Sequence, residues 1–274
     1  MNPVEAHYDR DPEREWERLT RHRTEFAVTC RVLAEHLPSP PGHILDVGGG
    51  PGRYALHLSR LGHRVTLLDL SRKSLDLALD LATAEGIYLP PPIQGDATAL
   101  PAEFTERFDA ALLMGPLYHL PDAADRLAAV REAYRVLRPG GVLIVEAISR
   151  YLPLIKILTR DLLEDARLAP LVTRTLQTGQ HRPDPDLEFF TTAFFHHPSG
   201  LKREAAKAGF IPGSIFAVEG PVRLLKEFGQ HWQQRERREW LLGVARQLEN
   251  EKVLLGVSGH MILTATKPKE MRRG

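Results

Sequence analysis

The sequence predicts an α/β fold built on a mostly parallel sheet. Segments typical of strands alternate with segments typical of helices from His43 to Ile148, and this alternation favours parallel strands joined by right-handed helical crossovers. A run of glycine and proline, DVGGGPG (Asp46–Gly52), separates the first strand from the helix that follows it. At the carboxyl edge of a parallel sheet, such a bare loop allows a ligand to approach the backbone closely.

The segment before this series predicts helix. PEREWERLTRHRTEFAVTCRVLAEHL (residues 12–37) has apolar residues at spacings typical of one or two amphipathic helices, and PSPPG ends it. Between the predicted strands the pattern indicates helices over 53–62, 72–86 and 122–137, and Ser71 is placed to cap the second helix. Five strand segments are predicted, of which the third is the weakest: 43–47, 64–70, 93–97, 107–115 and 142–148.

The alternation stops after Ile148. Residues 149–197 show no strand–helix rhythm and favour helix, then a proline and aspartate turn, then an aromatic stretch. The alternation resumes with a helix over 198–210 and a strand over 211–220. A long helical segment then precedes a last strand over 259–267. The two stretches that depart from simple alternation follow strand ends, so we expect both above the carboxyl edge of the sheet.

Composition limits the class of protein. The chain has 274 residues, of which 43% are apolar and 26% charged, and its formal net charge is +1. A globular protein without the large positive field of a nucleic-acid-binding protein is therefore predicted. The single cysteine excludes an internal disulfide and a cysteine-rich zinc site. No apolar run approaches the ~20 residues of a membrane span. We expect a cytoplasmic protein with no metal and no membrane or nucleic-acid partner.

The glycine loop by itself leaves the ligand open. GPGRYA, from Gly50 to Ala55, fits the G-x-G-x-x-G/A pattern of dinucleotide-binding loops. Asp69 ends the second predicted strand, where a carboxylate can accept hydrogen bonds from both hydroxyls of any ribose. These two features do not separate a nicotinamide cofactor from another adenosine ligand.

An ordered set of motifs narrows the choice. Asp46 and the alternating glycines are followed by Asp69, then by QGDATALP with Asp96, FDAALLMGPLYHL and RVLRPGG. In this order and spacing the set closely resembles the class I S-adenosylmethionine-dependent methyltransferases. The resemblance is strong over residues 42–147 and weaker over the last 75 or so. GPLYHL after the fourth strand is similar to a subgroup whose members methylate small molecules.

The resemblance implies a fold and a domain organisation. The fold would be Rossmann-like, a seven-stranded and mostly parallel sheet with helices on both faces and an antiparallel last strand. Residues 1–40 would form an N-terminal helical segment. Residues 41–148 and 198–274 would form the methyltransferase domain, and residues 149–197 would be an inserted helical lid that binds the substrate.

The resemblance also implies how S-adenosylmethionine is bound. Asp46 would face the amino group of the methionine part, directly or through water, and Asp69 would bind the ribose hydroxyls. Asp96 would accept from the adenine amino group. The remaining cofactor-binding positions would be Gly48, Gly49, Gly50 and Gly52 in the loop, Leu70 and Ala97 beside the adenine, and Met114 beside the methionine part.

On the acceptor side, Tyr118 and His119 follow the fourth strand and are the candidate catalytic residues. His119 is either a general base for a protonated acceptor or a residue that orients the loop. Methyl transfer to an O, N or C atom of a small molecule is the predicted reaction. A nicotinamide-dependent oxidoreductase and a non-catalytic S-adenosylmethionine-binding protein are the alternatives. The sequence does not identify the acceptor or the oligomeric state, for which a homodimer is one option.

Overall fold

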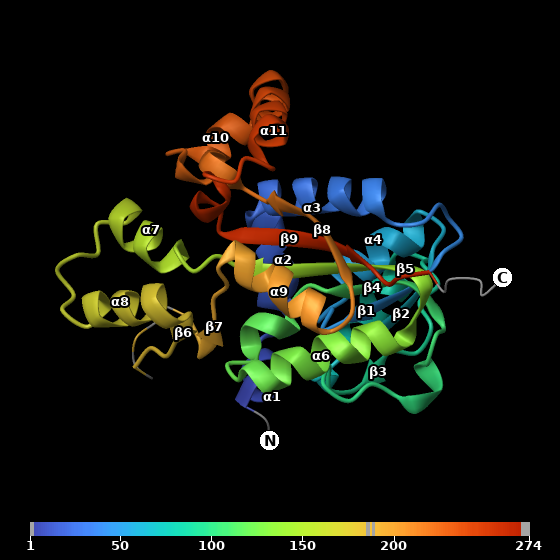
Figure 1. The fold of residues 1–274 in the computed structure, drawn as a ribbon. Coiled ribbons are helices and arrows are strands. Elements are labelled where there is room, and N and C mark those ends of the chain that lie inside the picture. Colours follow the sequence, from blue (N-terminus) through green and yellow to red (C-terminus); the bar gives the residue numbers. More distant parts are fainter. Residues whose placement is uncertain (1–2, 185–186, 188–189, 270–274) are drawn as a thin grey trace.

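The computed structural model describes residues 3–184, 187 and 190–269, so the ends of the predicted segments at 1–2 and 270–274 lie outside it, as do 185–186 and 188–189. Its centre is a seven-stranded sheet in the order β3-β2-β1-β4-β5-β9-β8 (Figure 1). Neighbouring strands from β3 to β5 are parallel, and β9 runs antiparallel to both β5 and β8. The predicted α/β fold with an antiparallel last strand is therefore confirmed.

The strands lie close to the predicted segments. β1 coincides with its prediction, whereas β3 keeps only two residues of the weak third segment. β5 begins five residues earlier than predicted, because Leu137 already pairs with Phe108 before a register shift at the Pro-Gly-Gly turn. The sheet contains β1 (His43–Val47), β2 (Arg64–Asp69), β3 (Ile93–Gln94), β4 (Phe108–Leu113), β5 (Leu137–Ile148), β8 (Ile211–Ala217) and β9 (His260–Thr266).

Alternate residues of each central strand enter two different cores. Ile44 packs on one face with α3 (Arg23–His36), α4 (Arg53–Arg60) and α5 (Arg72–Ala84). Leu45 and Val47 pack on the other face, because successive side chains of a strand point to opposite sides. That second face is covered by α6 (Ala123–Val136) and α9 (Pro198–Lys207). The sheet is thus buried on both faces, as a parallel sheet requires.

The N-terminal segment divides into three helices. α1 (Pro3–Tyr8) and α2 (Pro12–Arg21) lead into α3, and Asp11 caps α2 by accepting from the backbone N–H of Arg14 at 3.0 Å. Val32 and Leu33 of α3 are fully buried in the same core as β1. The predicted boundary at residue 40 therefore does not separate two cores, because α3 contributes to the core of the sheet.

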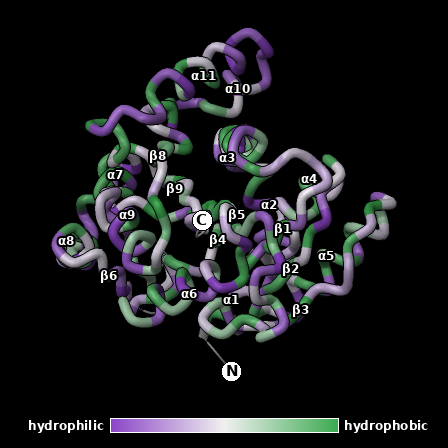
Figure 2. The backbone as a smooth tube through the Cα atoms, turned by 45° about the vertical axis from the view of Figure 1, so that its right-hand side comes forward, coloured by the Kyte–Doolittle hydropathy of each residue, from purple (hydrophilic) through white to green (hydrophobic). Residues whose placement is uncertain are grey.

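The two departures from alternation form two separate groups of helices outside the sheet (Figure 1). α7 (Leu152–Thr159) and α8 (Leu168–Thr178) form a small cluster beyond the sheet, next to the short ribbon of β6 (Gln180–His181) and β7 (Ala193–Phe194) (Figure 1). Between β8 and β9 the chain forms the 3₁₀ helix η3 (Gly220–Leu224), α10 (Phe228–Gln233) and α11 (Arg235–Leu248). Figures 1 and 2 show α10 and α11 above α3. No helix in the described part of the chain is long and apolar enough to cross a membrane.

Candidate active site

A cavity of about 270 Å³ lies at the carboxyl edge of β1, β2 and β4. Eleven of the twelve residues predicted for the site border it, and they come from four strand ends and the loops after them, which the sheet brings together. Gly52 does not border it. A Cβ on Gly52 would lie 3.2 Å from that of Ala78 and 3.3 Å from Leu67 Cδ2, so Gly52 allows close helix packing. The bordering residues are Asp46, Gly48, Gly49, Gly50, Asp69, Leu70, Asp96, Ala97, Met114, Tyr118 and His119.

Backbone conformation and crowding explain the bare loop. Gly48 and Gly50 have φ values of 70° and 53°, in the left-handed region that favours glycine. A Cβ on Gly48 would lie 2.5 Å from Pro116 Cγ, and one on Gly49 would lie 2.5 Å from Asp46 Oδ2. Any side chain at position 49 would therefore displace the Asp46 carboxylate. The loop is bare partly because it packs closely against its own neighbours.

Asp46 lies near the end of β1 as a fully buried carboxylate. Neither of its oxygens has a well-formed hydrogen bond among the described residues, and the nearby backbone N–H of Ala55 only partly offsets the effect of burial on its pKa. Burial, and then the negative charge of Asp69, raise the pKa of Asp46 to about 7. A buried carboxylate without a well-formed hydrogen bond is costly, and a cationic group bound in the cavity would remove that cost. Asp46 thus fits the amino group of the methionine part of S-adenosylmethionine.

Asp69 ends β2 and holds the glycine loop. Its Oδ2 accepts from the backbone N–H of Gly50 and its Oδ1 from that of Ser71, both at 2.8 Å. Burial raises the pKa of this carboxyl, and the two backbone hydrogen bonds oppose the rise. Because a carboxylate has about four lone-pair sites, both oxygens retain capacity for the hydroxyls of a ribose.

Asp96 has the geometry of a turn cap as well as a place in the cavity. Its Oδ1 accepts from the backbone N–H and the hydroxyl of Thr98, both at 2.8 Å. Among the described residues, the side-chain hydrogen bonds of Asp96 involve Oδ1 only. Its Oδ2 can therefore accept from an amino group in the cavity. Ala97 is nearly buried beside it.

His119 is held by a residue that sequence reasoning missed. Its Nε2 lies 2.6 Å from the hydroxyl of Tyr8 at the end of α1, and the two rings meet edge to face. Burial, and then the positive charge of His7, lower the pKa of His119 to about 3. Tyr118 is also buried, its hydroxyl is 3.5 Å from the Met114 carbonyl oxygen, and burial raises its pKa. Both side chains are therefore uncharged at neutral pH.

The N-terminal helices form one wall of this cavity, which the sequence did not indicate. Tyr8, Glu15, Arg18 and Leu19 border it, from α1 and α2. The Ser71 hydroxyl donates to Asp9 Oδ1 at 2.6 Å, which ties the end of α1 to the loop after β2. The only local signal was an aromatic residue within a charged N-terminus, and that is too weak to predict a site.

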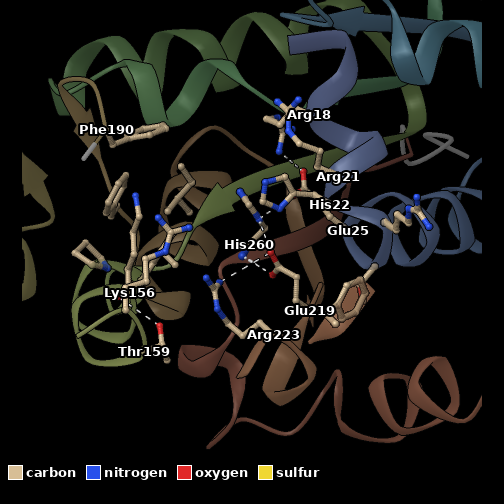
Figure 3. A pocket seen from close by; sticks show the side chains of 18 of the residues that line it. Arg18, Arg21, His22, Glu25, Lys156, Thr159, Phe190, Glu219, Arg223 and His260 are labelled. Atoms are coloured by element: carbon tan, nitrogen blue, oxygen red, sulfur yellow. Dashed lines mark hydrogen bonds and ion pairs between the residues drawn. The ribbon is translucent and has the colours of Figure 1, made fainter. Parts of the chain in front are cut away.

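A second cavity of about 460 Å³, which we call the basic pocket, lies beside the first (Figure 3). It is bordered by α2, the start of α3, α7, η3 and the start of β9, and Arg18 borders both cavities. The guanidinium of Arg18 donates from Nε to Glu15 at 2.7 Å and from Nη1 to Glu25 at 2.6 Å. Arg18 therefore forms part of the wall that the two cavities share.

A buried ionic cluster supports the basic pocket. His260 Nδ1 donates to Glu219 Oε1 at 2.8 Å and lies 3.4 Å from Glu25 Oε2. Burial by itself would lower the pKa of His260. The negative charges of Glu25 and Glu219 outweigh burial and raise the pKa to about 9. Burial raises the pKa of nearby Glu146 to about 8. Glu25, Glu146 and His260 each offer one ligand atom within 4.8 Å of one another, a grouping that could hold a metal ion and that the sequence did not suggest.

The central part of the chain is similar to known proteins. Residues 45–145 match the protein-family model described as a methyltransferase domain. Residues 45–145 form a methyltransferase domain. The match spans β1 to β5, from the strand that contains Asp46 to the strand that contains Glu146. The predicted S-adenosylmethionine cofactor is that of this class.

Relatives extend the methyltransferase match. Ubiquinone biosynthesis O-methyltransferase of Xanthomonas campestris is 31% identical over 123 residues, which are 45% of this chain and 50% of that protein. The protein of the same description from Caulobacter vibrioides is 30% identical over 182 residues, or 65% of this chain and 60% of that protein. The chain thus spans about half of the length of the curated relatives that it matches.

A solved structure supports the fold over most of the chain. The S-adenosylmethionine-dependent methyltransferase of Methanosarcina mazei is 21% identical, with a TM-score of 0.59, and the match covers 87% of this chain and 98% of that one. At this identity the likeness shows the Rossmann-like fold. The sheet of this fold extends beyond residues 45–145, to the strands β8 and β9.

The ionisation of Asp46 predicts a pH dependence of cofactor binding. The cofactor's cationic amino group favours ionised Asp46, whose pKa in the free protein is about 7. Below pH 7 a proton must leave before the ligand binds, so affinity should fall about tenfold per pH unit. We expect S-adenosylhomocysteine to bind about tenfold more weakly at pH 6 than at pH 8, measured by calorimetry.

Asp46→Asn is the matched control for this prediction. The amide keeps the shape of the carboxyl but does not titrate, so the variant should bind more weakly and lose most of the pH dependence. An affinity for the wild-type chain that stays constant between pH 6 and pH 8 would contradict the role given to Asp46.

Proposed function

We propose that this chain catalyses methyl transfer from S-adenosylmethionine to an oxygen atom of a small-molecule acceptor. The observation that carries the proposal is Asp46, a fully buried carboxylate without a well-formed hydrogen bond among the described residues, placed against a bare glycine loop. The relatives named O-methyltransferases support oxygen as the acceptor atom. When bound, S-adenosylmethionine would supply a sulfonium methyl group that a nucleophile attacks in line, with S-adenosylhomocysteine as the leaving group.

In this proposal the chain's own residues bind and orient S-adenosylmethionine. Asp46 pairs with the methionine amino group, Asp69 accepts from the ribose hydroxyls, and Asp96 accepts from the adenine amino group. Leu70, Ala97 and Met114 supply apolar contacts, and the glycines provide room. Because the reaction is a displacement, orientation of the two partners can contribute roughly 7–11 kcal/mol toward lowering the barrier.

Of the two roles left open for His119, the contacts support orientation. A base is most effective when its pKa lies near the working pH, whereas the pKa of His119 is lowered to about 3. Its Nε2 also faces the Tyr8 hydroxyl. In this proposal His119 fixes α1 over the cofactor, and Tyr118 packs beside it with Ile148 and Phe195 as a wall between the two cavities.

The segment 149–197 is proposed as the cover of the acceptor side. Leu152 and Lys156 of α7, together with His181, Phe190 and Phe195, border the basic pocket. They come from the segment that the sequence indicated as a lid, and they meet α2 and α3 across the pocket. The acceptor would thus lie between this segment and the N-terminal helices.

The test of the proposed function is transfer of a labelled methyl group. The chain is incubated with S-adenosylmethionine labelled in the methyl group and a panel of phenols, carboxylic acids and amines, and labelled product is detected by mass spectrometry. We expect label in a phenol or an acid, with S-adenosylhomocysteine as the second product. Saturable S-adenosylhomocysteine binding without label in any acceptor would favour a non-catalytic binding protein. Saturable NADH binding without any effect of S-adenosylmethionine would favour the oxidoreductase alternative.

The proposed function does not depend on the oligomeric state or on a nucleic-acid partner. A homodimer remains one option, and the absence of a nucleic-acid partner remains a prediction from the low net charge. Neither affects the placement of the two cavities, which are formed within one chain.

A further inference from the structure

The basic pocket carries far more positive charge than the chain as a whole. The formal net charge of the whole chain is +1. Among the described residues that border the pocket, two are glutamates, Glu25 and Glu219, and six are arginine or lysine. The six are Arg18, Arg21, Arg23, Lys156, Arg160 and Arg223.

The two glutamates do not cancel this excess. Glu219 is paired with His260 through both the ring and the backbone N–H, at 2.8 and 2.9 Å. Glu25 accepts from Arg18 and faces the same imidazole. The pocket therefore keeps a positive excess of several charges.

Arg223 borders the basic pocket and contributes to its positive charge. Its Nη1 is 4.0 Å from Glu219 Oε1, a long ion pair, so the guanidinium keeps donors for another partner. The Arg223 guanidinium occupies the space where a side chain at Gly259 would lie. The arginine therefore lies close to the start of β9 (Figure 3). Burial, and then the charges of Arg160 and Arg223, lower the pKa of Lys156 to about 8. These cations are close enough to repel one another, and an anion between them would relieve that repulsion.

A divalent cation fits the same cluster less well. His260 already donates to Glu219, and Arg18 occupies one oxygen of Glu25. A metal ion would have to compete with both contacts in a pocket that six basic side chains border. The charge balance therefore favours an anionic ligand over a metal ion.

The pocket also has an apolar side that faces the cofactor cavity. Ile148, Leu152, Phe190 and Phe195 border it. Phe190 lies parallel to His119 with 6.2 Å between the ring centres, and His119 borders the cofactor cavity. An aromatic ring on this side of the pocket would therefore be the part of a ligand nearest the methyl donor.

We propose that the basic pocket binds the methyl acceptor and that this acceptor is a small aromatic carboxylic acid. The carboxylate lies beside Arg223 and the ring against Phe190 and Phe195, so the ring substituent that accepts the methyl group faces Arg18 and the cofactor. This inference rests on the proposed function, because it treats the neighbouring cavity as the site of the methyl donor.

The test compares an acid with its neutral ester. Binding of 3,4-dihydroxybenzoate and of its methyl ester is measured by calorimetry in the presence of S-adenosylhomocysteine. A charge-assisted, bidentate contact to an arginine favours the acid over the ester by about tenfold or more. Arg223→Gln should reduce this preference to about twofold or less, and Arg223→Lys, which keeps the charge, should retain part of it. Arg235→Gln, an arginine whose side chain is 81% exposed on α11, should bind both compounds as the wild-type chain does.

The outcomes separate the two proposals. S-adenosylhomocysteine binding with equal affinities for acid and ester, or with no binding of either, overturns the aromatic-acid proposal and leaves the proposed function intact. The same holds if Arg223→Gln keeps the full preference for the acid. Absence of S-adenosylhomocysteine binding by the wild-type chain overturns the proposed function itself.

Discussion

Replacing Asp69 by alanine is expected to weaken S-adenosylhomocysteine binding by ~10²–10⁴-fold. The carboxylate lies at the end of β2, on the border of the cofactor cavity. There it would form two charge-assisted hydrogen bonds with the ribose, each contributing ~1.5–3 kcal/mol. The loss should be larger than that of most single contacts, because the same carboxylate also accepts from the backbone N–H groups of Gly50 and Ser71. Calorimetric titration of the purified variant measures the effect.

Two controls define the cause of that loss. Asp69→Glu keeps the negative charge but displaces it by one methylene, so it should bind more tightly than the alanine variant and more weakly than the wild-type chain. Asp76→Ala removes a carboxylate that is 53% exposed on α5 and pairs with Arg72, and it should leave the affinity unchanged. An alanine variant at position 69 that binds within twofold of the wild-type chain would show that Asp69 is not the ribose ligand.

Gly48→Ala is expected to destabilise the chain and to impair cofactor binding. The residue has a φ of 70°, which costs roughly 1–2 kcal/mol with a side chain. Its new Cβ would lie 2.5 Å from Pro116 Cγ, and overpacking of this kind costs ~1–3 kcal/mol. Together these effects should lower the melting temperature by about 5–15 °C. Since Pro116 begins the turn that carries Tyr118 and His119, its displacement should also weaken S-adenosylhomocysteine binding.

Gly229→Ala is the matched control for this glycine. It lies in α10, a Cβ there would meet nothing within 4 Å, and its φ is not in the left-handed region. Its effect on unfolding should therefore stay within about 1 kcal/mol. A Gly48→Ala variant that melts and binds like the wild-type chain would show that the close approach of Gly48 and Pro116 is not needed.

The fold could be predicted because its signals are local. Short apolar segments over 43–47 and 107–115 indicated strands, and those strands proved to be β1 and β4, with side chains divided between two cores. Asp69 was found because it ends a strand of a parallel sheet, and the resemblance to the methyltransferases added Asp46 and Asp96. The cofactor cavity brings all three together.

The wall formed by α1 and α2 could not be predicted in the same way. The contact between Tyr8 and His119 joins residues 111 positions apart, and no periodicity indicates where an N-terminal helix will pack. The basic pocket has the same origin, since Arg18, Lys156 and Arg223 come from segments far apart in the chain. Its ionic cluster was also missed. His260 at the start of β9 and Glu219 in the loop after β8 are 41 positions apart in the sequence, so no local pattern links them.

The role of Gly52 shows a limit of motif reasoning. The resemblance assigned it to the cofactor together with the other glycines of the loop. In the structure it begins α4 with a φ of 77°, and its missing side chain leaves room for Ala78 and Leu67. A glycine in a binding motif can therefore be required by the packing of the helix that follows.

The central claim is that this chain binds S-adenosylmethionine in the cavity bordered by Asp46 and Asp69. Titration of the wild-type chain with S-adenosylmethionine, followed by calorimetry and thermal unfolding, tests it most directly. The account predicts saturable binding of one molecule per chain. At one hundred times the dissociation constant the ligand stabilises the folded state by ~2.7 kcal/mol, so the melting temperature should rise by roughly 5–10 °C. No heat of binding and no change in melting temperature at millimolar S-adenosylmethionine or S-adenosylhomocysteine would contradict the account.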